Sequence, residues 1–141
     1  MGVLPVDDPR LLSSFTMTEK ALSTSDGGIG LARYQGDNYH RNEASGIGNP
    51  WFITTFWYVE FLIARAQNRQ DMDEVLTYIK WAADCTYKSS MLSEQFDAEH
   101  KRPISVTPIT WSHAGYVHVV VSYLAKLEAL GLCDDCYPVK K

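Results

Sequence analysis

The chain has 141 residues, 45% of them hydrophobic and 21% charged, which suits one packed domain and excludes an intrinsically disordered chain. Its formal net charge of −4 excludes the basic surface that nucleic acids and anionic membranes require, so neither partner is expected. Residues 1–8 contain no basic region followed by an apolar run, and no apolar stretch reaches bilayer length. These features predict a soluble, cytoplasmic protein.

Four helices are predicted. The first begins at Asp8-Pro9, where an N-cap acceptor precedes a proline at the first helical position, and it ends in the turn residues 23–28. The second begins in the same way at Asn49-Pro50 and runs to about residue 63. It is apolar on almost every side, so we expect it to be buried on most sides.

The third helix begins at Asp71, with Glu74 three residues later as in a capping box, and it carries a single apolar stripe. The fourth begins near Thr110, is apolar nearly all round and ends at Gly131. Its β-branched residues 117–121 could also form a strand, but the length and the flanking pattern favour a helix. One-faced and buried helices therefore alternate, which predicts an all-α array with an outer and an inner layer.

Two of the connections are long, about residues 24–48 and about residues 87–109, whereas residues 67–70 alone join the second and third helices. Structureless connections of that length are uncommon in compact domains unless they bind or catalyse something. If successive helices run antiparallel, both long connections lie at the same end, and each leads into the N-terminus of a buried helix. The functional groups are therefore expected at one rim of the array.

The first long connection contains several glycines together with Arg33, Asp37 and aromatic rings. Its glycines resemble a phosphate-binding loop, but no strand precedes them and no lysine follows, so this interpretation is weak. Fixed donors and acceptors beside flat apolar rings suit a sugar, whose hydroxyls need paired hydrogen bonds. A structural interpretation is equally open, in which Arg33 and Asp37 pair with each other and hold the loop.

The second long connection contains Glu94, a carboxylate that could activate a water as a general base, with Asp97 as the nearer alternative. A lone glutamate is, however, more often simply solvated. His113 and His118 are five residues apart and not the four of helical metal sites. Each is therefore predicted to be a buried, hydrogen-bonded histidine, and no metal is expected.

The cysteines are Cys85, Cys133 and Cys136, an odd set without framework spacing that favours a reducing compartment. The pair Cys133 and Cys136 has the spacing of a zinc or redox motif. A zinc site needs a second pair, and a thioredoxin-like motif needs a strand–helix context that is missing here. The sequence therefore predicts two ordinary thiols and no cofactor.

Four segments occur in the order and at the separations seen in the glucoamylase family of glycoside hydrolases, especially its prokaryotic, glucodextranase-like members. They are GLARYQGDNY at residues 30–39, GNPWF at 48–52, LSEQFD at 92–97 and TWSHA at 110–114. Each is only modestly specific by itself, but four in order make a strong resemblance that extends over most of the chain.

The resemblance implies that residues 1–141 are the C-terminal portion of a catalytic domain with an (α/α)6 barrel, contributing about four helices in alternating outer and inner layers. It implies hydrolysis, with inversion, of α-glucosidic bonds in an α-glucan or oligosaccharide substrate. Glu94 would be the general base. Carried over by motif, the substrate-binding residues would be Arg33, Tyr34, Asp37, Trp51, Gln95 and Trp111, with the two tryptophans lining the pocket.

The chain departs from the family pattern because the family's general acid lies in an earlier Trp-Glu motif, and this sequence contains no such pair. Inverting hydrolysis needs two carboxyl groups about 6.5–9.5 Å apart. We therefore expect the isolated chain to be nearly inactive, and to associate with the missing N-terminal part of the barrel or with itself. The alternative is a non-catalytic carbohydrate-binding or regulatory module on the same helical scaffold.

Overall fold

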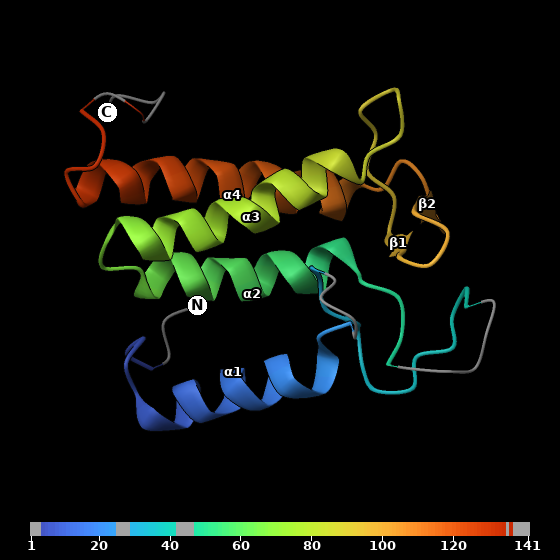
Figure 1. The fold of residues 1–141 in the computed structure, drawn as a ribbon, viewed down its shortest axis with the longest axis horizontal. Helices are drawn as coiled ribbons and strands as arrows, with labels where there is room; N and C mark the ends of the chain where they lie inside the picture. The colour runs from blue at the N-terminus through green and yellow to red at the C-terminus, as the bar shows by residue number, and fades with distance from the viewer. Residues whose placement is uncertain (1–3, 25–28, 42–46, 135, 137–141) are drawn as a thin grey trace.

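The computed structural model describes residues 4–24, 29–41, 47–134 and 136. Its four helices run alternately in opposite directions, so both long connections lie at one end of the molecule (Figure 1). The elements are α1 (Pro9–Leu22), α2 (Phe52–Arg65), α3 (Arg69–Asp84), β1 (Gln95–Asp97), β2 (Arg102–Ile104) and α4 (Thr110–Ala129). The mostly helical fold agrees with a partial (α/α)6 barrel, as predicted.

The helix starts show where local sequence decides and where it does not. Asp8 caps α1 by accepting a hydrogen bond from the Arg10 amide at 2.9 Å, as predicted. The prediction that Asn49-Pro50 starts α2 is wrong, because α2 begins at Phe52 after an extended N-cap residue without a side-chain cap. Pro50 is held in an extended bridge with Ala32, and its carbonyl accepts the Phe96 amide.

The start of α3 also differs from the prediction. The helix begins at Arg69, two residues before Asp71, and its N-cap is Asn68, whose side chain accepts from the Asp71 amide at 3.0 Å. The Asp71 carboxylate in turn accepts from the Gln67 amide at 2.7 Å. Asp71 thus belongs to the cap as the third helical residue, and the predicted Asp71–Glu74 capping box is wrong.

The fourth helix is continuous through the β-branched run, so the preference for helix over strand is confirmed. It ends where Gly131 adopts a positive φ of 66°. The Gly131 amide bonds to the Glu128 carbonyl, and the Leu132 amide bonds to the Leu127 carbonyl, which is the Schellman arrangement of a glycine-terminated helix.

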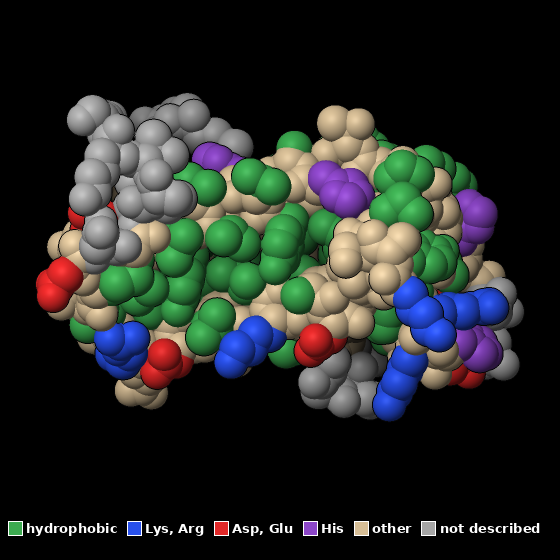
Figure 2. All heavy atoms as spheres, turned by 90° about the horizontal axis from the view of Figure 1, so that it is seen from above, with side chains coloured by type: hydrophobic (Ala, Val, Ile, Leu, Met, Phe, Trp, Pro, Cys, Tyr) green, Lys and Arg blue, Asp and Glu red, His purple; other side chains and the backbone are tan. Residues whose placement is uncertain are grey.

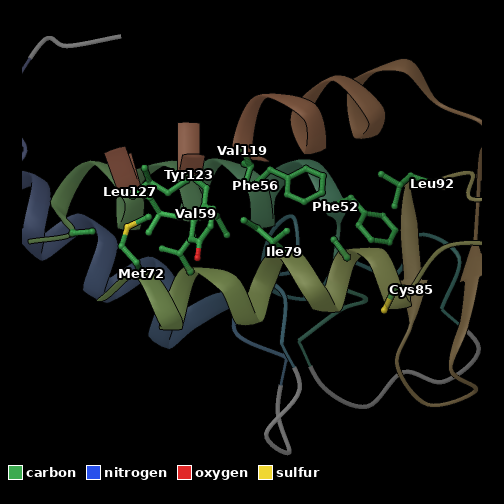
Figure 3. Packing of buried hydrophobic residues seen from close by; sticks show 14 residues of the cluster. Phe52, Phe56, Val59, Met72, Ile79, Cys85, Leu92, Val119, Tyr123 and Leu127 are labelled. Atoms are coloured by element: carbon green, nitrogen blue, oxygen red, sulfur yellow. The ribbon is translucent and has the colours of Figure 1, made fainter. Parts of the chain in front are cut away.

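The core lies between α2, α3 and α4, which contact one another along their lengths (Figures 1 and 3). The α2–α4 approach is close at Gly115, where a Cβ would lie 2.8 Å from Cδ2 of Phe56. Full burial of a large apolar side chain contributes about 2 kcal/mol to stability. The central residues are Phe52, Phe56 and Val59 from α2, Met72, Val75 and Ile79 from α3, and Val119, Tyr123 and Leu127 from α4.

Of the two helices predicted to be buried, α2 is buried on most sides, as predicted, whereas α4 is buried on one side only. Trp57 of α2 and Val117 of α4 are 53% and 60% exposed. Hydrophobic side chains form a broad exposed band over this part of the surface (Figure 2). The prediction of burial is therefore confirmed for α2, which packs against α1, α3 and α4. It is wrong for α4 within the described residues, because α2 and α3 cover one side of α4 and leave the opposite side open. None of the described helices has the length and hydropathy needed to cross a membrane.

The first helix packs beside α2 through Phe15, which contacts the rings of Tyr58 and Phe61, and it has no fully buried residue. The Phe15 ring stacks on Phe61 with a centroid distance of 3.5 Å. This one-sided contact agrees with the prediction that the first helix has one apolar face.

A two-stranded hairpin in the second long connection was not predicted. Strands β1 and β2 pair antiparallel, with Gln95 opposite Ile104 and Asp97 opposite Arg102. Strands of three residues are too short to show an alternating pattern, so the sequence carries no signal for them.

The prediction of two ordinary thiols at Cys133 and Cys136 is wrong, because the structure joins them in a disulfide. Their Cα atoms lie 5.8 Å apart, within the range that a disulfide spans. This bond removes the basis on which the cysteine count favoured a reducing compartment. Cys85 is a free, buried thiol, and burial together with the nearby Asp84 charge raises its pKa to about 12.

Candidate functional site

The two long connections meet at the N-terminal end of α2. Ala32 forms a β-bridge with Pro50, and Trp51 forms one with Gln95. The Trp51 amide bonds to the Leu31 carbonyl at 2.9 Å. The Arg33 segment and the Glu94 segment therefore flank one extended backbone strip, and the common rim predicted from antiparallel order is present.

Glu94 is held by both its backbone and its carboxylate. Its amide bonds to the Val106 carbonyl at 3.0 Å, and its own carbonyl accepts from Phe52, the first residue of α2. The side chain is buried, and its Oε2 accepts a hydrogen bond from the Ser105 hydroxyl at 2.5 Å. The solvated glutamate considered from sequence is therefore not what the structure shows.

Ser105 is a contact that sequence reasoning missed. It follows β2 directly and has a φ of 70°, an uncommon left-handed conformation for a residue other than glycine. The hairpin turns the chain back so that Ser105 reaches a carboxylate eleven residues earlier. Without the register of β1 and β2, nothing in the sequence marks this serine.

Arg33 and Asp37 form a bidentate pair, with Nε and Nη2 each 3.0 Å from a carboxylate oxygen. The guanidinium also lies over three rings, 4.1 Å from the Trp51 centroid, 4.9 Å from Tyr34 and 5.5 Å from Tyr39. We call Arg33, Asp37 and these three aromatic residues the arginine platform. The pairing of Arg33 with Asp37 that the structural interpretation expected is therefore present. The same residues also form a flat cationic and aromatic surface at the rim.

Burial raises the pKa of Asp37, but hydrogen bonds from Arg33 and the Tyr39 amide, together with the Arg33 charge, outweigh this effect. The pKa of Asp37 therefore lies below its ordinary value. Asp97 behaves in the same way, because hydrogen bonds from the amide and ring of His100 outweigh the effect of burial and lower its pKa.

These two depressed values predict sensitivity to acid. A carboxylate with a lowered folded-state pKa contributes its full stabilisation above its unfolded value, about 4, and loses it as pH falls through the folded value. We expect circular dichroism to show a thermal midpoint that falls between pH 5 and pH 3, and falls less in Asp37→Asn and Asp97→Asn. The exposed Asp73→Asn should keep the full pH dependence, and equal slopes in all variants would contradict this assignment.

The predicted site residues divide by exposure. Tyr34 and Trp111 are 51% and 47% exposed, and the Arg33 side chain is 37% exposed. Asp37, Trp51 and Gln95 are buried. The first group can touch a ligand as the structure stands, whereas the second supports it from beneath.

Two buried donors at this rim have no hydrogen-bond partner within the described residues, namely Nε1 of Trp51 and Nε2 of Gln95. Gln95 is oriented by Asn49, whose side-chain amide donates to its Oε1 at 3.0 Å. Ser112 also has a buried hydroxyl without a described partner. Buried polar groups in folded proteins are nearly always satisfied, so donors of this kind mark places where an acceptor oxygen would bind favourably.

Asp97, the alternative base, is already engaged. Its Oδ2 lies 2.9 Å from His100 Nδ1 and 3.6 Å from Arg102 Nε. A carboxylate bound by two cationic or donor groups is a poor proton acceptor. The geometry therefore favours Glu94 over Asp97 for base chemistry.

The two histidines differ. His113 is partly buried and accepts the Leu92 amide at Nε2, 3.2 Å away, so it is hydrogen-bonded as predicted. His118 is 63% exposed and lies 3.6 Å from Glu60, so its predicted burial is wrong because it lies on the uncovered side of α4. Within the described residues, His, Cys, Asp and Glu side chains form no group of three or more that could hold a metal ion.

A surface pocket of about 410 Å³ lies at the other end of α2, between the start of α1 and the α2–α3 turn. Asp7, Leu12, Arg65, Asn68 and Glu74 contribute to its walls. It contains none of the predicted site residues, so we place the candidate site at the rim formed by the two long connections.

Comparison with known proteins gives one family. The model of glycosyl hydrolases family 15 matches residues 1–80, which include Arg33 and Trp51 and end before Glu94. An uncharacterized glycosyl hydrolase of Methanocaldococcus jannaschii is 29% identical over 125 residues, covering 82% of this chain and 19% of that protein. The chain thus spans about a fifth of the length of this relative. No solved structure matches the chain significantly. With more than half of its residues matched by one family model, the chain belongs to glycosyl hydrolases family 15.

Proposed function

We propose that this chain is the base-bearing part of an enzyme that hydrolyses α-glucosidic bonds in oligosaccharides or polysaccharides with inversion. Glu94 takes the proton of a water whose oxygen attacks the anomeric carbon. A second carboxyl group, supplied from outside this chain, protonates the departing glycosidic oxygen as the bond to carbon breaks. The oxygen of the water becomes the hydroxyl group on the inverted anomeric carbon, and the departing oxygen receives the proton of the acid. Glu94 then releases its proton to solvent and the acid is reprotonated from solvent.

The observation that carries this proposal is the placement of Glu94. The carboxylate is buried, held by Ser105, and lies on the same backbone strip as the arginine platform. A base must be held in a defined position within reach of its water, and such positioning contributes a large part of catalysis. A sugar bound on the platform would bring its anomeric carbon to this end of the molecule.

The exposed members of the rim supply the substrate contacts in this proposal. Arg33 and Tyr34 donate to sugar hydroxyls, and Trp111 offers a flat apolar face to the C–H side of a ring. Asp37 and Gln95 act from beneath by orienting Arg33 and the base segment.

The partner that we propose for the exposed apolar band of α2 and α4 is the remainder of the catalytic domain, or another copy of the chain where that remainder is absent. Exposed apolar surface of this extent marks an interaction site. We expect sedimentation velocity to show self-association of the isolated chain, and Val117→Glu to abolish it. Met17→Glu is the control, since Met17 is equally exposed at 60% but lies on α1. A monomeric native chain would contradict this expectation.

Loss of the Ser105 hydroxyl should lower activity without unfolding the protein. We expect Ser105→Ala to lower kcat about 10- to 100-fold, the scale of one hydrogen bond to a charged group. Ser105→Gly removes the same hydroxyl but relieves the left-handed backbone, so it should lose as much activity and be more stable than Ser105→Ala. Steady-state kinetics and urea unfolding separate the two effects, and full activity in either variant would remove Ser105 from the mechanism.

The proposal is tested on the complete gene product that contains this chain, with maltose, isomaltose and dextrin as substrates. Release of glucose whose initial anomer, followed by proton NMR, is β supports inverting hydrolysis of an α bond. Initial release of the α anomer overturns inversion. Binding of oligosaccharide without turnover would instead favour the non-catalytic carbohydrate-binding module.

A further inference from the structure

The segment that carries Glu94 is buried but is neither helix nor extended sheet along most of its length. Leu92, Ser93, Glu94 and Gln95 are each at most 7% exposed. A buried backbone N–H group needs a partner, because water cannot reach it. In this segment the backbone groups find separate partners and not one continuous ladder of hydrogen bonds. Each of these partners therefore also restricts where Glu94 can lie.

One of these partners is a side chain from a different element. The Leu92 amide donates to Nε2 of His113 at 3.2 Å. A backbone amide can only donate, so Nε2 must be the unprotonated nitrogen and the neutral ring carries its proton on Nδ1. His113 stands in the first turn of α4, a helix anchored in the core by Val119 and Tyr123.

We infer that His113 is a positioning residue. Its hydrogen bond to the Leu92 amide, which we call the His113 latch, holds the Glu94 segment against the first turn of α4. This inference deepens the proposed function, since it rests on Glu94 as the base. The His113 latch fixes the backbone two residues before Glu94, whereas Val106 and Ser105 hold Glu94 itself from the hairpin side. The base is thereby held from two independent elements, which restricts both translation and rotation of its carboxylate.

Two substitutions of the same residue separate the latch from simple packing. In His113→Gln the amide oxygen takes the place of Nε2 and can still accept from Leu92. In His113→Asn the shorter side chain places its oxygen near the position of Nδ1, where it cannot reach that amide. Both residues are uncharged amides, so they differ chiefly in whether an acceptor stands at the required place.

Amide hydrogen exchange by NMR on the 141-residue chain gives the first readout. We expect the Leu92 amide to keep its protection in His113→Gln and to exchange about 10- to 100-fold faster in His113→Asn. Nitrogen-15 spectra of the ring should show the proton on Nδ1. Equal Leu92 protection in the two variants, or a proton on Nε2, overturns the latch.

Kinetics of the complete gene product give the second readout. We expect kcat to fall at least about tenfold in His113→Asn with KM little changed, and to recover in His113→Gln. Equal kcat in the two variants overturns the positioning role. If the native protein releases no glucose, the proposed function fails, and the exchange measurement still decides whether His113 holds the segment.

Discussion

In the complete gene product, the Glu94→Gln variant should hydrolyse maltose and dextrin with a kcat about 10²- to 10⁴-fold below the native value, the usual contribution of a positioned general base. Glutamine has nearly the same shape, and its amide oxygen can still accept from the Ser105 hydroxyl. What it lacks is the ability to take a proton from water. The fold should therefore survive, as circular dichroism and an unchanged unfolding midpoint can verify.

Glu99→Gln is the matched control for this variant, because Glu99 is an exposed glutamate in the turn of the same hairpin. Its kcat should equal that of the native protein. Asp97→Asn tests the rival base and should affect acid stability far more than kcat, since Asp97 is bound by His100 and Arg102. Retention of activity in Glu94→Gln together with its loss in Asp97→Asn would transfer the role of base to Asp97.

The helices could be predicted from sequence wherever their ends are decided by neighbouring residues. Asp8 caps α1 and Gly131 ends α4, because both signals act within one turn of the chain. At Asn49-Pro50 the same signal is present, but bridges to Ala32 and the Phe96 amide keep the backbone extended. Long-range backbone pairing thus overrides a local cap, and no local pattern reveals it.

Burial of the helices was harder to predict than their existence. A helix that is apolar nearly all round is expected to be surrounded, and α2 is buried on most sides with Trp57 as an exposed exception, yet α4 leaves Val117 and Trp111 exposed. The hydrophobic pattern of a helix indicates which of its faces can be buried. Which faces are in fact buried depends on the neighbouring helices that are present. Within the described residues α1, α3 and α4 all pack on α2, whereas α2 and α3 cover one side of α4 and its opposite side remains open.

The position of the candidate site could be predicted from sequence, but the contacts that hold its residues could not. Two long connections at one end, with Arg33 in the first and Glu94 in the second, placed the candidate groups at a common rim. The contacts that hold Glu94 depend on tertiary register, since Ser105 arrives through a hairpin and His113 from another helix. Such partners carry no periodic or spacing signal of their own.

The largest expected effect on stability comes from Gly30, which lies near the start of the first long connection and packs on Pro50 beneath the candidate site. Gly30 has a φ of 117°, and a Cβ there would lie 2.7 Å from Cβ of Pro50 and 3.0 Å from the Trp81 ring. We expect Gly30→Ala to cost about 3 kcal/mol or more, because backbone strain of about 1–2 kcal/mol adds to the cost of overpacking. Urea unfolding measures this loss directly.

Gly36→Ala separates the two causes of that loss. Gly36 has a similar left-handed φ of 74°, but a Cβ there would meet nothing within 4 Å, so only the strain of about 1–2 kcal/mol should appear. The clash at Gly30 pushes on Pro50 and so displaces Trp51, over which the Arg33 guanidinium lies. Oligosaccharide binding, measured by calorimetry, should therefore weaken in Gly30→Ala and persist in Gly36→Ala. Equal losses of stability and binding in the two variants would mean that left-handed strain alone is responsible, and that close packing of Gly30 on Pro50 does not hold the arginine platform in place.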